Sequence, residues 1–246
     1  MKRLKILIAL GLFGLLALAL YWYAPYKVEG YGYYHKIWAH RANSIEKANK
    51  ALDYFKGVEL DLVYDKASNT LDVNHPPTES INLTFEHYLS EINLKDMPYL
   101  WLDIKNLNED NAYLIQTKLV AMFKTYNYDL SRVLVESTEA KVLPIFDREG
   151  FLTSYYLPYG LSLRKPKDLE KTVSEIKRYI KYQPHLMLSS DYQDYAIVTE
   201  KFPKRYKCFW AIERPINNKY DEIRTVLKDT KVKVVLLNYR TINTDR

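Results

Sequence analysis

Apolar, strand-like runs alternate with helical patterns along most of the chain, and this alternation constrains the fold more than any other feature. The expected strands are 37–39, 58–64, 99–104, 133–137, 154–157, 186–189, 209–212 and 232–237. The expected helices are 43–55, 84–92, 110–126, 139–148, 167–182, 194–202 and 219–228. Asn43 and Glu46 are expected to form a capping box at the start of the first of them. Repeated βα units predict a parallel sheet, and eight strands predict an α/β barrel of the (β/α)8 TIM type. Because only residues 238–246 follow, we expect this barrel to lack a full last helix or to borrow cover from the segment before its first strand.

The N-terminal segment predicts a membrane anchor. Basic residues at positions 2, 3 and 5 precede an uncharged, mostly apolar run of about 18 residues, which is long enough to span a bilayer. The run ends in Tyr21-Trp22-Tyr23, an aromatic belt, and not in the small-x-small site that usually closes the shorter apolar core of a cleaved signal peptide. We therefore expect one transmembrane helix with its N-terminus in the cytoplasm and the following domain outside. The expected organisation is an anchor at 1–25, a linker at 26–36 and a barrel at 37–246.

Composition excludes several classes of protein. With 48% hydrophobic and 27% charged residues, the chain has an ordinary globular composition and is not disordered. The net charge is +6, but lysine and arginine are scattered and form no long basic run, so we expect no nucleic-acid partner. Cys208 is the only cysteine, which excludes an intramolecular disulfide.

Two acidic residues interrupt an otherwise apolar expected strand. Glu59 and Asp61 lie two positions apart in the segment 57–64, so both side chains face the same side of the strand. Charged residues are seldom buried without a partner, and adjacent carboxylates repel each other unless a cation lies between them. The pair therefore indicates a metal site. Asp103, in the strand at 99–104, supplies a third oxygen ligand of the kind that Mg²⁺ or Ca²⁺ prefers.

Basic and titratable residues accompany these acids in a fixed order. The chain presents His40-Arg41, then Glu59-x-Asp61, then His75, then Asp103-x-Lys105. This order resembles the glycerophosphodiester phosphodiesterases of the phospholipase-C-like phosphodiesterase superfamily, whose pattern is His-Arg, Glu-x-Asp, His and acid-x-Lys. The segments 40–44 and 74–77 are also similar to the menorin branch of that superfamily.

The resemblance implies roles for these residues that agree with their chemistry. It implies a divalent cation, Mg²⁺ or Ca²⁺, held by Glu59, Asp61 and Asp103. It implies acid/base work by His40 and His75, whose side chains titrate near neutral pH. Arg41 and Lys105 would add positive charge at the phosphate. Glu136 and Trp210 fall where the family often has a polar and an aromatic site residue.

The leading functional hypothesis is a membrane-anchored, metal-dependent phosphodiester hydrolase acting on glycerophosphodiesters or lysophospholipids. A catalytically silent barrel that serves as a binding module is an alternative, because fold does not fix function. Three departures from the family pattern keep it open: Asp103 replaces a glutamate, Ala42 replaces a glycine, and the usual Glu-Asn-Thr is missing. A phospholipase C- or D-type activity of the same superfamily is a further alternative.

Overall fold

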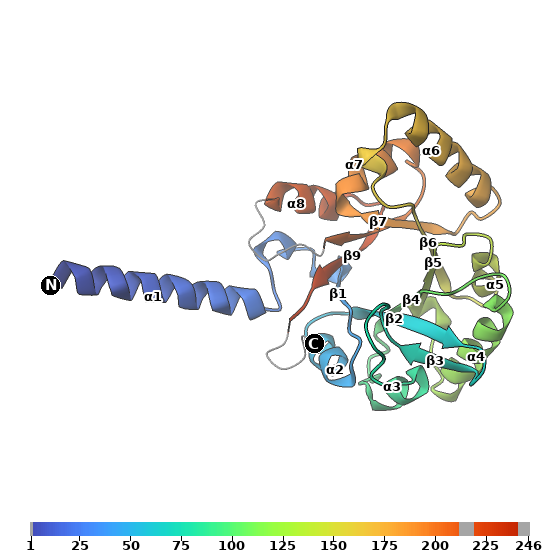
Figure 1. Cartoon of the computed structure of the whole chain (residues 1–246), viewed down its shortest axis with the longest axis horizontal. Coiled ribbons are helices and arrows are strands. Elements are labelled where there is room, and N and C mark those ends of the chain that lie inside the picture. Colours follow the sequence, from blue (N-terminus) through green and yellow to red (C-terminus); the bar gives the residue numbers. More distant parts are fainter. Residues whose placement is uncertain (1, 212–218, 241–246) are drawn as a thin grey trace.

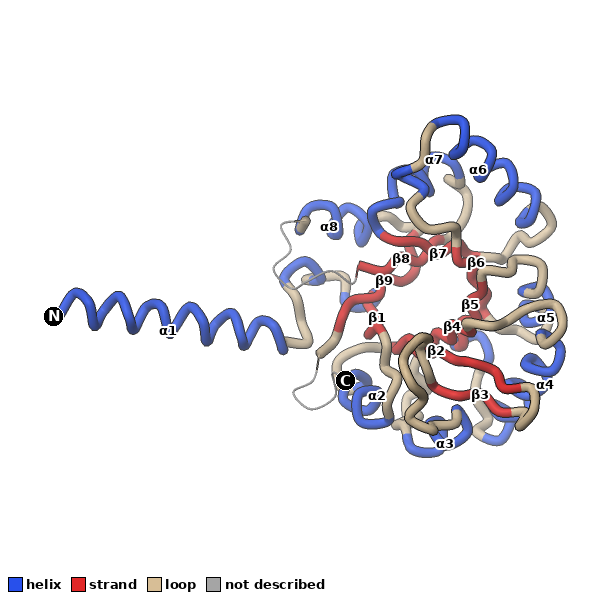
Figure 2. The backbone as a smooth tube through the Cα atoms, in the orientation of Figure 1, coloured by secondary structure: helices blue, strands red, loops and turns tan. Residues whose placement is uncertain are grey.

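The computed structural model describes residues 2–211 and 219–240. Eight parallel strands close into a barrel, because β1 pairs with both β2 and β9 (Figures 1 and 2). They are β1 (Ile37–His40), β2 (Gly57–Asp65), β4 (Tyr99–Ile104), β5 (Val133–Ser137), β6 (Leu152–Tyr156), β7 (Met187–Asp191), β8 (Lys207–Ala211) and β9 (Val232–Asn238). The eight expected strands and the barrel are therefore confirmed, with strand ends displaced by at most two residues. Ile212, expected to end the seventh strand, lies outside the described residues.

Helices cover the outside of this ring of strands (Figure 2). They are α2 (Ile45–Leu52), α3 (Phe85–Glu91), α4 (Ala112–Thr125), α5 (Leu143–Asp147), α6 (Pro166–Ile180), α7 (Tyr195–Lys201) and α8 (Tyr220–Lys228). Short 3-10 turns lie at Val28–Gly30, Tyr34–Lys36, Leu130–Arg132, Leu161–Leu163 and Tyr192–Asp194. Each expected helix is present, although most are shorter than the sequence pattern indicated.

Only Tyr239 and Arg240 are described after β9, and the expectation of an incomplete last helix otherwise concerns residues 241–246, which lie outside the described residues. The segment just before β1 packs beside α8. Arg224 Nη1 donates to the carbonyl oxygens of Glu29 and Tyr31, at 3.2 and 2.9 Å. Lys36 Nζ donates to the carbonyl oxygens of Leu227 and Asp229, at 2.9 and 2.8 Å. This segment thus supplies part of the missing cover.

The expected start of α2 needs a correction. Asn43 and Glu46 were expected to form a capping box, but Ser44 is the N-cap, and its hydroxyl accepts from the backbone N–H of Lys47 at 3.2 Å. Asparagine and serine are both good N-caps, so residue type alone does not choose between Asn43 and Ser44. The Asn43 side chain lies instead against Asp61 in the barrel.

A ninth strand, β3 (Thr70–Val73), was not expected. It pairs antiparallel with the C-terminal part of β2, from Leu62 to Asp65, of which only Leu62 is also paired with β4. The intervening turn includes Asn69 at φ 52°, a left-handed conformation that Asn tolerates better than most residues. This hairpin carries the chain to His75, which therefore follows β3 and not a barrel strand.

Two apolar clusters lie on the two faces of the closed sheet. The outer one lies between strands and helices, and the inner one includes Trp38, Trp101, Cys208 and Trp210. Gly57 makes room for the inner cluster, since an added Cβ would lie 2.7 Å from Trp38 Cδ2. The floor of the barrel is therefore packed, and a pocket can form only above it.

Helix α1 (Lys2–Tyr23) extends away from the barrel (Figure 1). Its 22 residues are apolar enough to cross a membrane, and none of them is buried. By length and composition, the helix matches the expected anchor.

Candidate active site

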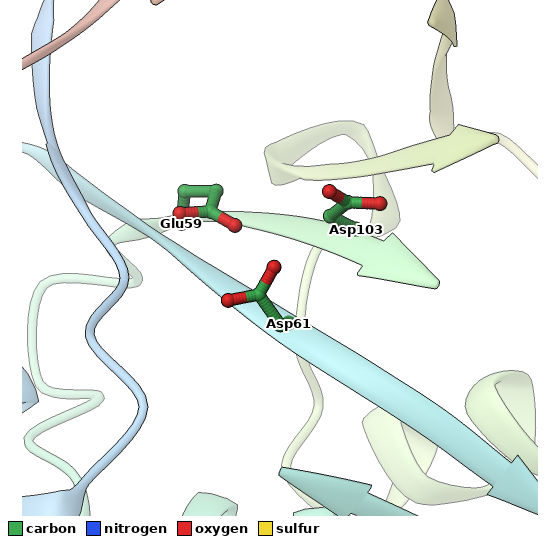
Figure 3. Close-up of side chains that lie close together, drawn as sticks. All are labelled: Glu59, Asp61 and Asp103. Atoms are coloured by element: carbon green, nitrogen blue, oxygen red, sulfur yellow. The ribbon is translucent and has the colours of Figure 1, made fainter. Parts of the chain in front are cut away.

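Strand register brings the acidic residues to one level inside the barrel. Asp61 of β2 is paired with Asp103 of β4, and Asp103 with Glu136 of β5. Glu59 lies two residues before Asp61 and faces the same side. Figure 3 shows the carboxyl groups of Glu59, Asp61 and Asp103 turned toward one another above β2 and β4.

One oxygen from each of Glu59, Asp61 and Asp103 lies within 4.8 Å of the others, so the three could hold a metal ion. Glu59 and Asp61 are buried, whereas Asp103 is partly exposed. Burial raises the pKa of Glu59 well above its usual value, and the charges of Asp61 and Asp103 raise it further. Burial also raises the pKa of Asp103. The cluster therefore carries a charge repulsion that a cation would relieve.

Lys105 supplies positive charge at this cluster. Its Nζ lies 2.7 Å from Asp61 Oδ1 and also donates to Asp103 Oδ2. Burial alone would lower the pKa of Lys105, but the carboxylates of Asp103 and Asp61 outweigh it and raise the pKa above its usual value. Lys105 therefore remains an ammonium ion throughout the physiological pH range.

His40, at the end of β1, is held at both ring nitrogens. Nδ1 lies 3.2 Å from Asn238 Oδ1, at the end of the neighbouring β9, and Nε2 lies 3.7 Å from Glu59 Oε2. Burial and then the charge of Arg41 lower the pKa of His40 to about 3, and the attraction of Asp61 does not compensate. His40 is therefore neutral at pH 7. A proton on Nδ1, shared with Asn238, leaves Nε2 as an acceptor facing the acids.

Arg41 adopts a left-handed backbone conformation, with φ 52°. Its N–H donates to Glu59 Oε2 at 2.6 Å, which orients the buried carboxyl group. The guanidinium group reaches across to the second histidine, with Nη2 2.7 Å from His75 Nε2, and its Nε lies 3.8 Å from Asp61 Oδ2. Since arginine can only donate, His75 accepts at Nε2 and is neutral in this contact. Arg41 thus links the two histidine-bearing segments at the rim.

A single cavity of about 90 Å³ unites these side chains. The nine residues expected at the site all line it: His40, Arg41, Glu59, Asp61, His75, Asp103, Lys105, Glu136 and Trp210. Tyr156 and Leu236 complete the lining. Trp210 stacks on Tyr156, with ring centroids 4.8 Å apart, and forms an aromatic wall. Glu136 is buried and accepts from Ser189 Oγ, while burial and then Asp103 raise its pKa. One side of the cavity is thus strongly charged and the other aromatic.

The sequence reasoning missed three residues of the site. Asn43 was assigned to a helix cap, but its Nδ2 donates to Asp61 Oδ2 at 2.7 Å and its Oδ1 accepts from the Asp61 N–H at 2.9 Å. Asn238 directly follows the last expected strand, and that polar residue at a strand end was the available signal. Tyr156 lay inside the expected strand 154–157, where period-2 alternation placed it on the same face as Ser154.

The donor set fits a hard divalent cation. Three carboxylates converge, and the amide of Asn43 and the N–H of Arg41 fix the orientation of two of them. Cationic groups and neutral imidazoles surround the same point. The arrangement can therefore bind an anionic group, neutralise its charge and move protons.

No family model and no curated protein matches this sequence. Solved structures match its fold. A glycerophosphodiester phosphodiesterase from Parabacteroides distasonis is 18% identical, with 82% of this chain and 92% of that chain covered and a TM-score of 0.53. An Oleispira antarctica phosphodiesterase, in complex with the product sn-glycerol-3-phosphate, is 12% identical, with 83% of this chain and 93% of that chain covered and a TM-score of 0.54.

A calcium-dependent phosphoinositol-specific phospholipase C from Pseudomonas sp. is also similar, at 13% identity, with 90% and 92% of the two chains covered and a TM-score of 0.52. The chain therefore shares its barrel fold with these phosphodiesterases and with this phospholipase C. The fold implied by the sequence resemblance is thereby confirmed. At these identities the likeness concerns the fold alone.

Proposed function

We propose that this chain is a metal-dependent phosphodiester hydrolase that acts on glycerophosphodiesters or lysophospholipids. The observation that carries the proposal is that all nine residues expected from the sequence pattern line one cavity. A silent binding barrel would have no need of two histidines and three converging acids in one small pocket. The fold shared with phosphodiesterases adds support.

Glu59, Asp61 and Asp103 would hold Mg²⁺ or Ca²⁺, which supplies Lewis-acid stabilisation of charge on a phosphoryl oxygen. Arg41 has a planar, partly exposed guanidinium group that suits the two non-bridging oxygens of a phosphodiester. Lys105 would add fixed positive charge beside the acids. These residues bind and orient the phosphate.

His40 and His75 are proposed as the proton-transfer pair. As a neutral imidazole, one removes a proton from the attacking water. The other must first take up a proton, which it then donates to the departing alkoxide. Asn238 fixes the ring of His40, and Arg41 fixes that of His75. The aromatic wall of Tyr156 and Trp210, with Glu136 beneath it, is proposed to contact the alcohol portion of the substrate.

We further propose that α1 is an uncleaved anchor, with its N-terminus in the cytoplasm and the barrel outside. The chain would then consist of the anchor at 1–25, the segment 26–36 and the catalytic barrel at 37–246. The length of the apolar helix and its basic N-terminal flank support this arrangement.

A leaving-group test addresses the proton-transfer pair. His40→Ala and His75→Ala should each lower the rate on a glycerophosphodiester by about 100- to 10,000-fold. A nitrophenyl diester, whose leaving group needs no proton, should partly rescue the variant that lacks the acid and leave the other unrescued. His185→Ala, at an exposed position, serves as the control. Wild-type rates in both site variants would contradict the hydrolase proposal and favour the binding barrel.

A further inference from the structure

Aromatic and basic side chains surround the point where α1 meets the barrel. We call this surface the juxtamembrane collar. Its exposed apolar members are Tyr23, Tyr26, Val28, Tyr31, Tyr54 and Tyr220. Its basic members are Arg224 and Arg240, both partly exposed, whereas Lys27 beside them is buried. Amphipathic rings and long cationic side chains are the residues that concentrate at membrane–water interfaces.

Direct contacts hold α1 against the barrel. Lys27 Nζ donates to the carbonyl oxygens of Tyr21 and Trp22, at 2.5 and 3.1 Å, and so satisfies the end of the helix. The Tyr21 hydroxyl donates to Glu29 Oε2 at 3.1 Å. The guanidinium group of Arg240, which follows β9, lies 4.2 Å from the centre of the Trp22 ring. These contacts come from the segment before β1 and from the residues that follow β9, so α1 is not attached through a free hinge.

The collar itself is packed onto the barrel. Arg224 of α8 lies over the rings of Tyr33 and Tyr220, at 5.1 and 5.6 Å, while its Nη1 binds backbone carbonyls of the segment before β1. The rings of Tyr26 and Tyr54 lie 5.8 Å apart, which connects the same segment to the end of α2. The exposed rings are therefore carried by a fixed surface that continues directly from the helix.

The direction of α1 decides which side of the barrel faces the bilayer. Figure 2 shows the ring of strands end-on, while α1 runs across the picture and meets the barrel wall between α8 and α2. The helix thus lies across the barrel axis. With α1 spanning the bilayer, the collar comes to the headgroup layer, and the pocket entrance at the C-terminal ends of the strands faces along the membrane surface.

We propose that the barrel docks side-on against the headgroup layer of the bilayer that α1 crosses, through the juxtamembrane collar. The occupant of the collar is the lipid interface, because the surface is continuous with the spanning helix and combines exposed tyrosines with partly exposed arginines, which lipid phosphates attract. This inference depends on the membrane anchor proposed above and not on the catalytic proposal. In this orientation a dissolved phosphodiester reaches the pocket directly, whereas a lysolipid must leave the bilayer.

The test uses the full chain in phosphatidylcholine vesicles, with a fluorophore at one introduced cysteine. The native thiol of Cys208 is fully buried and does not compete for the label. Tyr31→Cys reports on the collar. Tyr182→Cys, two residues after α6, a helix that lies away from α1 in Figure 1, is the matched control, because the two tyrosines are 80% and 83% exposed. Leu163→Cys, 79% exposed in the loop between β6 and α6, reports on the entrance side.

Vesicles that carry a nitroxide on the lipid headgroup should quench the label at position 31 several-fold more strongly than the labels at 163 and 182. Equal quenching at all three positions would overturn side-on docking, and strongest quenching at 163 would show an entrance turned toward the bilayer. Flotation of the vesicles is measured first. A chain that does not float with them would overturn both the anchor and this inference, whereas hydrolysis in detergent would still report on the catalytic proposal.

Discussion

His40 offers a quantitative test of the electrostatics of the site. A free imidazole has a pKa of about 6.5, and burial beside Arg41 lowers the pKa of His40 to about 3 in the folded chain. The folded protein therefore binds fewer protons at this position than the unfolded chain does. The stability that a neutral His40 contributes is present above the unfolded pKa and is lost as the pH falls toward the folded pKa.

The size of the effect follows from these two pKa values. Between pH 7.5 and pH 5, protonation of the unfolded histidine should lower the free energy of unfolding by about 2 kcal/mol. His40→Asn keeps a polar side chain near Asn238 and has no titration in this range. The difference in unfolding free energy between wild type and His40→Asn should therefore shift by that amount over the interval. Subtracting the variant removes the contribution of the other titrating groups.

The assay is urea unfolding of the full chain in mild detergent with a chelator, followed by tryptophan fluorescence. Trp38, Trp101 and Trp210 lie inside the barrel and report on its unfolding. His185→Asn, at an exposed loop position, should follow the wild type at both pH values. If wild type and His40→Asn lost the same unfolding free energy between pH 7.5 and pH 5, the argument that burial holds His40 neutral would be refuted.

Three further outcomes follow from the structure. A divalent cation should raise the melting temperature of the wild type by mass action. Glu59→Gln and Asp61→Asn should each remove that shift, whereas the control Asp65→Asn, at the exposed end of β2, should keep it. Because burial raises the pKa of Glu136, the native state loses stability as the pH rises above the usual carboxyl range. The free energy of unfolding of Glu136→Gln, measured by urea melts, should therefore rise relative to that of the wild type between pH 5 and pH 8. The full chain should stay with membranes after an alkaline carbonate wash, and its release would contradict the anchor.

The barrel could be predicted because its information is local. Each strand is an apolar run between helical patterns, and the spacing of Glu59 and Asp61 shows directly that they share a face. Asp103 could also be placed, because parallel strands align their ends. These predictions needed only the period of a strand and the geometry of a parallel sheet. Glu136 was expected at the site from the family resemblance alone.

The parts that were missed depend on contacts between distant segments. The interaction of His40 with Asn238 exists only because the barrel closes between β1 and β9. Asn43 has the composition of a helix cap, and only the fold shows that Asp61 lies within its reach. Strand β3 is only four residues long and is stabilised by pairing with β2. The alternation of polar and apolar residues over so short a segment does not reveal that pairing.

The central claim is that this cavity hydrolyses phosphodiesters with a bound divalent cation. The most direct measurement is the initial rate of glycerophosphodiester hydrolysis by the purified full chain, with Mg²⁺ or Ca²⁺ and after chelation, beside Asp61→Asn and the exposed-site control Asp65→Asn. We expect product from wild type and Asp65→Asn with cation, and loss of product after chelation or in Asp61→Asn. Absence of product from the folded wild type with either cation, or equal rates in all samples, would contradict the claim.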